Sequence, residues 1–424
     1  MKLFRTVIAA LLLLCCTVVT AQDFTVGGIY YNILSSTDQT VEVTYNDELF
    51  YYGASSYSGS ITIPSSVTYS GTTYSVTTIR DLAFYCCSSL ANVTLPNSLT
   101  TIKNQAFYNC TSLASITIPN SVTTIGSNAF YACTSLTSIE IPSSVTTIGN
   151  SAFSDCSSLT SISVAAGNTT YDSRDNCNAI IQPATNTLVA GCKNTVIPNS
   201  VTAIGDKAFY YCSSLASITI PSSVTAIGYK AFYYCSNLAN ITSLISADKL
   251  FIPDDDAFYN INPNCTLYVP AGAKETYATT VSWLKFTNIV ELSVFDLTVS
   301  AAKYATLYLD FDAVIPQGVE VYTASTVDGN RLMMEQVTDI LPANTGVIVR
   351  AEQGTYSFYQ SYDLPQTIEG NLFRGSVEDV YITPAKEAKY YVLSMKDGVV
   401  GMYEDALTVG TFKNNANKAY LVLG

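Results

Sequence analysis

The chain of 424 residues contains no histidine. This absence excludes Ser-His and Cys-His nucleophile pairs, HExxH zinc sites and imidazole acid–base catalysis. Charged residues make up only 12% of the chain, and acids outnumber bases 33 to 20, with a net charge of −13 and no basic run. We therefore expect no nucleic-acid partner and no electrostatic attraction to an anionic membrane surface. Only carboxylates, lysine and tyrosine remain as catalysts, so the sequence favours a protein that is not an enzyme.

Long apolar runs are missing too, except at the N-terminus. Residues 1–21 begin with basic residues, continue with the apolar run 7–19 and end at a small-residue cleavage site before Gln22, which is typical of a signal peptide. We expect a protein that is secreted or displayed on the outer cell surface, with no membrane span in the mature chain. A lipoprotein anchored through Cys15 or Cys16 stays open as an alternative, although no small residue stands just before either.

One sequence pattern returns every 23 residues. Its clearest copy is ITIPNSVTTIGSNAFYACTSL at 116–136, and three columns of residues keep the same step. The columns are Phe84, Phe107, Phe130, Phe153, Phe209 and Phe232; Pro96, Pro119, Pro142, Pro198 and Pro221; and Cys87, Cys110, Cys133, Cys156, Cys212 and Cys235. Extra residues at 69–74 and a longer excursion at 163–194 interrupt the step, and we expect both insertions to be loops.

Each unit predicts a short strand and a short helical turn. Leu113, Ile116 and Ile118 alternate with polar residues before a proline, which indicates a strand with a broken end, and 128–133 favours a single helical or 3-10 turn. One unit offers about six large apolar side chains worth roughly 12 kcal/mol, whereas ordering its backbone costs on the order of 23 to 46 kcal/mol. A unit cannot fold alone, so we expect the units to stack into a solenoid.

Residues 113–136 follow the pattern L-x-x-I-x-I-P-x-x-V-x-x-I-G-x-x-A-F-x-x-C-x-x-L, as do 136–159 and 215–238. This pattern resembles the BspA-like leucine-rich repeat of bacterial surface proteins, and the similarity covers 61–292. Arg80 and Lys103 depart from it, because each replaces the usual glycine. The resemblance implies a curved repeat scaffold on an exported protein of host-associated anaerobes, with adhesion to host proteins or to other bacteria as its role.

Composition changes mark the other domains. Residues 22–60 alternate in a way that predicts an N-terminal β cap for the first coil. From 293 to 424 the repeat vanishes, and short apolar runs between turn signals predict an antiparallel β-sandwich. Segments LPANTGVIV at 341–349 and NKAYLVL at 417–423 resemble a C-terminal module of Bacteroidetes surface proteins. The expected fold class is an α/β repeat, a leucine-rich-repeat solenoid over 61–292, followed by this sandwich.

Tyrosines form the first candidate binding surface, because one follows the repeat phenylalanine in most units. They are Tyr85, Tyr108, Tyr131, Tyr210, Tyr233 and Tyr259, and Ser154 interrupts the row. Such a row gives rigid amphipathic area with a polar tip, as in recognition surfaces and sugar-stacking sites. An equally open interpretation is that the rings lean on one another and shield the phenylalanine column beneath them.

The strand face is the second candidate surface. Its side chains two residues before each proline include Thr94, Thr117, Glu140 and Thr219. This face is rich in hydroxyl groups and suits a glycan or an extended protein surface. The alternative is that threonine and serine are there only as good solvent-facing strand residues.

Cysteines and acids are the remaining candidates for chemistry. Twelve cysteines less two in the signal peptide leave ten; we expect buried thiols in the repeat column, and Cys177 and Cys192 are candidates for a disulfide. We expect no metal site, since Cys-x-x-Cys and histidine are both missing. The run 254–256 and the pair Asp310 and Asp312 favour solvated loop acids, although a hydrolase with two facing carboxylates stays open as a third interpretation.

The sequence thus predicts an exported bacterial cell-surface binding or adhesion protein without a cofactor, which engages a host or bacterial protein through the solenoid surface. The alternative is a glycan-binding component of a polysaccharide-capturing surface system.

Overall fold

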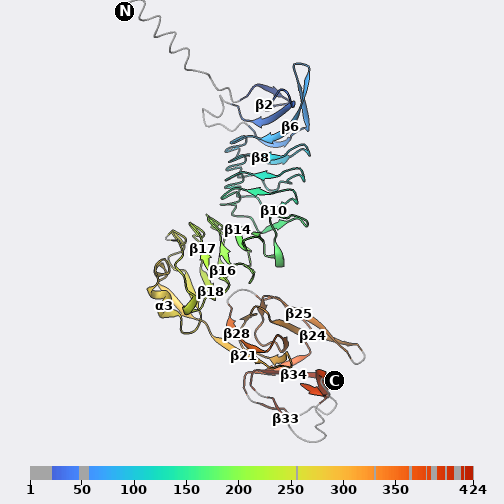
Figure 1. Cartoon of the computed structure of the whole chain (residues 1–424), viewed down its shortest axis with the longest axis vertical. Coiled ribbons are helices and arrows are strands. Elements are labelled where there is room, and N and C mark those ends of the chain that lie inside the picture. Colours follow the sequence, from blue (N-terminus) through green and yellow to red (C-terminus); the bar gives the residue numbers. More distant parts are fainter. Residues whose placement is uncertain are drawn as a thin grey trace, which may run out of the picture. The chain divides into compact units, whose positions relative to one another are not determined.

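The computed structural model describes residues 22–46, 57–254, 256–328, 331–361, 365–378, 380–382, 389–396, 399–404, 412–414 and 416–423 (Figure 1). The predicted signal peptide and Asp255 lie outside these ranges. The chain divides into two compact units. The first holds Met1–Ala216, Ser223–Ala239 and Phe251–Pro263, and the second holds Ser217–Ser222, Asn240–Leu250 and Asn264–Gly424. Within the described ranges, no helix has the length and apolar character needed to cross a membrane.

The first unit opens with a sheet that changes from antiparallel to parallel pairing. Strands β1 (Phe24–Val26), β2 (Ile29–Ser35) and β3 (Thr40–Thr44) form an antiparallel meander, and β3 pairs in parallel with β6 (Thr72–Ile79). The sheet continues in parallel through β8 (Thr101–Ile102), β9 (Thr124–Ile125) and β11 (Thr147–Ile148). At its side β5 (Ser66–Tyr69) forms a hairpin with β6. The meander therefore gives the first repeat strand a hydrogen-bonded neighbour instead of an open edge.

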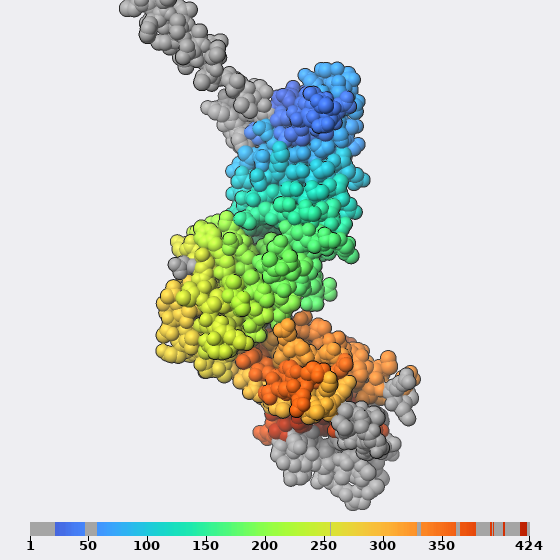
Figure 2. Space-filling view, viewed as in Figure 1, coloured from blue at the N-terminus to red at the C-terminus, as the bar shows by residue number. Residues whose placement is uncertain are grey.

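A second set of parallel strands lies before the repeat prolines. Strand β4 (Gly59–Thr62) pairs with β7 (Leu90–Thr94), a single bridge joins Asn92 to Ser115, and β10 (Ser138–Ile141) pairs with β12 (Ser161–Val164). In both sets each residue faces its equivalent one repeat later, so each 23-residue unit adds one extended segment to each set. The repeats follow one another as bands from blue to green in Figure 2.

The segment around each repeat phenylalanine forms consecutive hydrogen-bonded turns instead of the predicted helical turn. The N–H of Asn128 donates to the Asn150 carbonyl in the next repeat (3.0 Å), and that of Phe130 donates to the Ala152 carbonyl (2.8 Å). Asn128 has a φ of 54° and Ala132 of 56°, and these left-handed residues prevent a continuous right-handed helix. Every second N–H thus points to the following repeat and builds a third ladder between coils. The same two positions are left-handed in other repeats, at Gln105 and Asn109, Ser151 and Asp155, Lys207 and Tyr211, and Lys230 and Tyr234.

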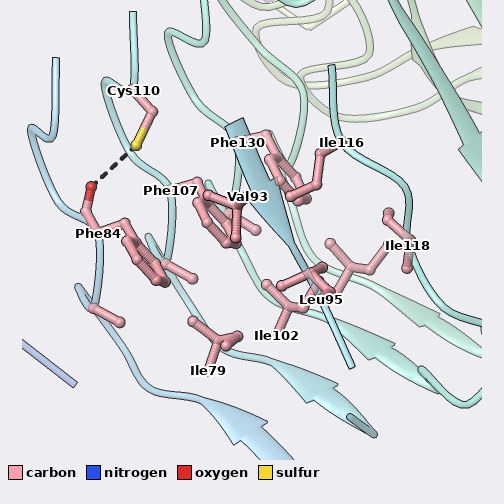
Figure 3. Packing of buried hydrophobic residues seen from close by; sticks show 14 of the residues in the cluster. Ile79, Phe84, Val93, Leu95, Ile102, Phe107, Cys110, Ile116, Ile118 and Phe130 are labelled. Carbon is pink, nitrogen blue, oxygen red and sulfur yellow. Dashed lines mark hydrogen bonds between the residues drawn. The ribbon is translucent and has the colours of Figure 1, made fainter. Parts of the chain in front are cut away.

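Phenylalanines stack in the core of the first unit (Figure 3). Ring centroids are 4.8 Å apart for Phe84 and Phe107, 5.2 Å for Phe107 and Phe130, and 5.6 Å for Phe130 and Phe153, with planes within 4° of parallel. Each of these rings is buried. Burial of a phenylalanine contributes roughly 2 kcal/mol, and each stacked pair adds about 1 kcal/mol. The alignment expected from the 23-residue spacing is present.

Arg80 and Lys103, which stand where other repeats have glycine, neutralise a buried acid. Glu42 of β3 is only 5% exposed, and its carboxylate lies 3.4 Å from Arg80 Nε and 2.8 Å from Lys103 Nζ. At the equivalent Gly126, an added Cβ would lie 2.5 Å from the Lys103 backbone, so later coils pack too closely for a side chain there. Buried charges require such partners, which explains why this end of the repeat carries basic residues.

The 163–194 excursion contains a β-hairpin. Strand β13 (Ala179–Gln182) pairs with β14 (Thr187–Gly191), and a 3-10 turn, η1 (Arg174–Asn176), precedes them. Strand β14 then pairs in parallel with β15 (Ala203–Ile204), which pairs with β17 (Ala226–Ile227). The excursion therefore starts a new sheet, separate from the one that ends at β11.

The second unit begins with the parallel sheet β16-β18-β19-β20. Its parts are β16 (Ser217–Ile220), β18 (Asn240–Ser243), η2 (Ala247–Lys249), β19 (Thr266–Val269), α3 (Lys274–Thr279), η3 (Trp283–Lys285) and β20 (Asn288–Glu291). Tyr277 of α3 is fully buried, and its hydroxyl bonds Ser243 Oγ (2.6 Å) and the Ile245 carbonyl (2.9 Å). Its ring meets that of Trp283 edge-on, which fixes the short helix against the sheet.

The rest of the second unit is built from antiparallel sheets, as the sequence predicts for this region. One sheet has β21 (Val294–Val299), β28 (Gly354–Gln360), β23 (Ala313–Val314) and β26 (Ile340–Leu341); a second has β22 (Tyr304–Leu307), β27 (Val347–Arg350), β24 (Glu320–Asp328) and β25 (Arg331–Val337). A third has β29 (Phe373–Ser376), β34 (Lys418–Leu423), β31 (Lys389–Lys396) and β32 (Val399–Glu404), and β30 (Val380–Ile382) pairs with β33 (Phe412–Asn414). The first two sheets share one core, to which Leu297, Val321 and Phe358 belong.

Candidate binding surface

Tyrosines that follow the repeat phenylalanines stack along the first unit. The ring centroids of Tyr85 and Tyr108 are 5.0 Å apart and those of Tyr108 and Tyr131 are 4.8 Å apart, with planes inclined by 18° and 12°. All three residues are half-buried. The pattern returns in Tyr210, Tyr233 and Tyr259, at 5.3 and 5.0 Å.

The spacing of these rings follows from the backbone. Phe130 turns into the core, and the next residue, Tyr131, lies on the outside of the same turn. Hydrogen-bonded neighbouring segments lie about 4.8 Å apart, so equivalent aromatic residues reach stacking distance whenever consecutive repeats carry them. The tyrosines that follow the repeat phenylalanines in the sequence therefore lie next to one another in the structure.

Two further tyrosines widen the row. Tyr211 and Tyr234 stack with centroids 4.7 Å apart and planes within 4°. Each also contacts the tyrosine before it, Tyr210 or Tyr233, at 4.7 Å. Neither follows a phenylalanine directly, so the row predicted from that position leaves them out; the doubled Tyr-Tyr in two consecutive repeats is the signal that indicates them.

An edge-on contact continues the row past Ser154. Tyr131 lies 6.2 Å from Tyr211, with ring planes inclined by 68°. Ser154 itself is buried at 7% exposure, and the neighbouring Asp155 is half-buried. We call the whole row the tyrosine strip: Tyr85, Tyr108, Tyr131, Tyr210, Tyr211, Tyr233, Tyr234 and Tyr259.

Stacking determines which part of each ring a partner can reach. Tyr108 and Tyr233 each stack between two rings, and the other members of the strip each stack on one, so ring edges and hydroxyl groups make up much of what the strip presents. Burial raises the pKa of Tyr85, Tyr108 and Tyr131, and at Tyr131 the charge of Asp155 raises the pKa further. The hydroxyls therefore stay protonated at neutral pH and both donate and accept hydrogen bonds. Such a surface suits polar groups of a protein better than sugar rings that stack on open aromatic faces.

Charge is distributed unevenly along the strip. Lys207 Nζ lies 5.5 Å from the Tyr210 ring centroid, and Lys230 Nζ lies 4.5 Å from that of Tyr233. Asp155 lies in the middle, and burial raises the pKa of its carboxyl. The later half of the strip therefore carries cations held over aromatic faces, whereas the middle carries an acid.

The strand-face candidates fall on separate short strands. Thr94 ends β7, Thr117 lies in an extended stretch outside any assigned strand, and Glu140 lies in β10; all three are exposed. Thr219 lies in β16 of the second unit and is half-buried. Within the first unit, the described pairing joins β4 to β7 and β10 to β12 but does not merge them into one sheet.

Other threonine hydroxyls have structural partners. Thr100 Oγ1 donates to the Thr77 carbonyl (3.1 Å), and Thr123 Oγ1 donates to the Thr100 carbonyl (3.3 Å). Thr146 repeats the bond one coil later, to the Thr123 carbonyl (3.4 Å). Part of the hydroxyl content of the repeats thus links neighbouring coils and needs no ligand to explain it.

Cysteines of the repeat column are buried thiols, except Cys212, which is half-exposed. Cys110 Sγ donates to the Phe84 carbonyl (3.1 Å), and Cys133 Sγ donates to the Phe107 carbonyl (3.2 Å). Burial raises the pKa of both thiols well above the usual range. The thiols are therefore neutral hydrogen-bond donors that link consecutive coils, and weak nucleophiles.

The excursion cysteines are also thiols in the structure. Cys177 Sγ donates to the Ala179 carbonyl (3.6 Å), and Cys192 Sγ donates to the Asn178 carbonyl (3.3 Å). A disulfide between them stays a prediction, which the mass of the protein before and after reduction tests.

The acids singled out in the sequence support loops. Asp254 Oδ1 accepts the N–H of Asp256 (3.0 Å), and Asp312 Oδ1 accepts the N–H of Ala343 (2.6 Å). Over the part of the chain that the structure describes, no three acids or cysteines come together as metal ligands would.

Comparison with known proteins adds to this geometry. The family model for the BspA type leucine rich repeat region (6 copies) matches residues 77–180 and 188–301, together about half of the chain. The interval between the two matched stretches, 181–187, contains the turn of the β13–β14 hairpin. No curated protein matches the chain.

Solved structures of bacterial leucine-rich repeat proteins are similar. One from Bacteroides ovatus is 26% identical, covering 64% of this chain and 76% of that chain with a TM-score of 0.40. A leucine-rich cell surface protein from Faecalibacterium prausnitzii is 23% identical (63% and 94% covered, TM-score 0.31). A leucine-rich repeat protein from Eubacterium ventriosum is 19% identical (62% and 83% covered, TM-score 0.39).

Proposed function

This chain belongs to the BspA-type leucine-rich repeat family, and we propose that it is an exported surface protein that binds an extracellular host or bacterial protein through the tyrosine strip. Family membership favours a surface or adhesion-type role in protein binding. The observation that carries the proposal is the strip itself, in which half-buried rings stack in register across consecutive repeats.

The physical form of the strip favours a protein partner. Aromatic residues already held by stacking lose little conformational freedom on binding, which lowers the entropic cost of association. Their hydroxyls provide donors and acceptors at a spacing near 5 Å, and Lys207 and Lys230 add positive charge at one end. Many weak contacts, spread over several coils, together give specific binding of a large ligand.

Other parts of the chain have supporting roles in this proposal. The signal peptide 1–21 directs export, residues 22–60 cap the stack, and the solenoid 61–292 presents the strip. The C-terminal region 293–424, as a β-sandwich, acts as a spacer or anchor. The strip is proposed to act in binding alone, with no catalytic step.

Binding assays with the intact mature chain test the proposal. Immobilised extracellular matrix proteins and a glycan array are probed with the wild type and with the double variant Tyr131→Ala/Tyr210→Ala, and exposed Tyr304→Ala in the second unit is the control. We expect a protein ligand whose affinity falls about tenfold or more in the double variant and is unchanged in the control. Unchanged affinity in a folded double variant would transfer the role to the strand face, which Thr117→Ala/Glu140→Ala then tests. Binding confined to the glycan array would favour a polysaccharide-capturing role instead.

A further inference from the structure

Repeats on either side of the excursion do not pair as the others do. Strand β11 is the last member of its sheet, and β14 begins the pairing with β15 and β17. Instead of meeting a neighbouring strand, the N–H of Ile148 donates to the Tyr171 hydroxyl (3.2 Å). The stack therefore contains a gap between β11 and β14, inside the first unit.

The turn ladder stops at the same gap. Ser151 and Asp155 have φ of 57° and 58°, so this coil has the backbone form that directs alternate N–H groups to the next coil. Within the described part of the chain, the N–H groups of Ser151, Phe153 and Asp155 donate no hydrogen bond. The equivalent groups one coil earlier donate to carbonyls at 2.8 to 3.0 Å.

A cavity of about 250 Å³ lies against this unused row of donors. Its lining includes Ile148, Ser151, Phe153, Val189, Ala190 and Ala208. The Oγ atom of Ser151 is buried and has no hydrogen-bond partner in the described part of the chain. The volume approaches the lower end of the range for small-ligand pockets, roughly 300 Å³. A buried hydroxyl without a partner is unfavourable, which points to a ligand that bonds it.

We propose that this gap is a docking slot for a peptide segment of a partner protein, which takes the place that the turn segment of a following coil has elsewhere in the stack. Peptide carbonyls at alternate positions accept the N–H groups of Ser151, Phe153 and Asp155, and the segment continues the turn ladder beside residues 150–156. Because Val189, Ala190 and Ala208 line the cavity, the inserted side chains are small and apolar.

The occupant is a peptide because the same donor row already holds one elsewhere in this chain. In the preceding coil the acceptors are the carbonyls of Asn150, Ala152 and Ser154, which are spaced by two residues along the turn segment of the next coil. Backbone N–H groups in this conformation also bind anions. Here, however, Asp206 and Lys207 line the cavity and Asp155 adjoins it, and two carboxylates against one ammonium group disfavour a further negative charge.

This slot adjoins the middle of the tyrosine strip, where Asp155 belongs to both, and adds to the proposed function a second site that recognises the sequence of a peptide. A partner's flexible or terminal segment would enter the slot while its folded surface contacts the strip, and two linked contacts bind more tightly than either alone. The slot inference does not require that the strip bind anything.

A displayed random heptapeptide library, selected on the intact mature chain, tests the slot. We expect enriched peptides with small apolar residues, and about tenfold or more weaker binding to Ala190→Trp, which fills the cavity. The control is Ala226→Trp in β17, an exposed alanine outside the cavity lining, which should bind as the wild type does. Equal binding to both variants, or no enrichment at all, would overturn the proposal.

Backbone hydrogen exchange gives a second readout that does not depend on how Ala190→Trp folds. The amides of 150–156 should exchange faster than those of 127–133 in the free protein and slow about tenfold when a selected peptide is added. Ser151→Ala should keep the stability of the wild type, because it removes a hydroxyl without a partner, and should weaken peptide binding.

Equal protection of 150–156 by inorganic phosphate would identify an anion site and contradict the proposal of a peptide ligand. Retained peptide binding in Tyr131→Ala/Tyr210→Ala would separate this slot from the strip.

Discussion

The ring of Tyr131 meets the ring of Tyr211 edge-on, with centroids 6.2 Å apart. These residues belong to repeats on opposite sides of the excursion, where β11 ends one sheet and β14 belongs to the next. An aromatic contact therefore links two parts of the stack that lack the strand pairing found between other coils. This places the strip in two roles, as a surface and as a structural joint.

Stacking within the strip should contribute to stability. Tyr108→Ala removes ring contacts to both Tyr85 and Tyr131, so we expect a loss of about 2 kcal/mol in the free energy of unfolding, measured by urea denaturation. Tyr259→Ala at the end of the strip, where the side chain is 47% exposed, should lose less. Equal losses in both variants would mean that stacking adds little beyond ring burial.

Because the coils pack closely, substitution of the repeat glycine should destabilise the protein. Gly126→Ala places a Cβ 2.5 Å from backbone atoms of Lys103 and Asn104, and we expect it to destabilise the protein by about 2 kcal/mol or more. Ser127→Ala, in the same coil, is the control and should change stability by less than about 0.5 kcal/mol. Urea denaturation followed by circular dichroism measures both. A Gly126→Ala variant as stable as the control would contradict the packing described here.

The buried carboxylate of Glu42 should matter more than an exposed one. Glu42→Gln leaves Arg80 and Lys103 without their anion, and we expect a loss of about 3 kcal/mol. Glu320→Gln breaks the exposed pair with Arg350, 2.9 Å long, and should lose less than about 1 kcal/mol. Equal losses of unfolding free energy in the two variants would contradict the importance of burial at Glu42.

Alkaline pH should destabilise the first unit, because it holds buried groups with raised pKa values. Burial raises the pKa of the Cys177 thiol to about 11 from 9.0 and that of the Tyr31 hydroxyl to about 12 from 10.0. The folded state then binds protons that the unfolded state has released, so the contribution of Cys177 is complete below about pH 9 and is lost as pH rises to about 11. Urea denaturation across this range should show falling stability, with a shallower fall in Cys177→Ala. A flat profile would contradict the burial of these groups.

Thiols of the buried repeat column should react more slowly with alkylating reagents than a half-exposed thiol. Cys110, Cys133 and Cys156 are buried with raised pKa values, so iodoacetamide should leave them unmodified in the native protein, whereas half-exposed Cys86 should react first. Mass spectrometry of digested protein measures the modification at each site. Rapid labelling of Cys133 in native protein would contradict its place in the core.

Spacing in the sequence was enough to predict the stacked units and the phenylalanine column, because a side chain repeated every 23 residues is buried only by its own copies. The turn conformation was not predictable, because Gln105, Ala132 and Tyr211 adopt left-handed backbone, which their residue types rarely adopt. Hydrogen bonds to the next coil hold these residues in place.

Pairs distant in sequence escaped prediction for a different reason. Glu42 and Lys103 are 61 positions apart, and nothing in either segment indicates the other until the meander is placed on the first coil. The gap beside Ser151 also could not be predicted from the sequence, because whether an N–H has an acceptor depends on which segment lies next to it in the fold. The tyrosine row was predictable in part, since its positions follow the phenylalanines, but the doubled residues Tyr211 and Tyr234 were not considered.

The turn ladder gives the stack a direction. Each coil offers donors to its successor and acceptors to its predecessor, so the two sides of a coil differ while all coils are alike. A tandem duplication of one 23-residue unit would therefore find matching neighbours on both sides without any new contact having to be invented. Lengthening or shortening such a protein in evolution needs only a change in copy number, and the reach of its binding surface changes with it.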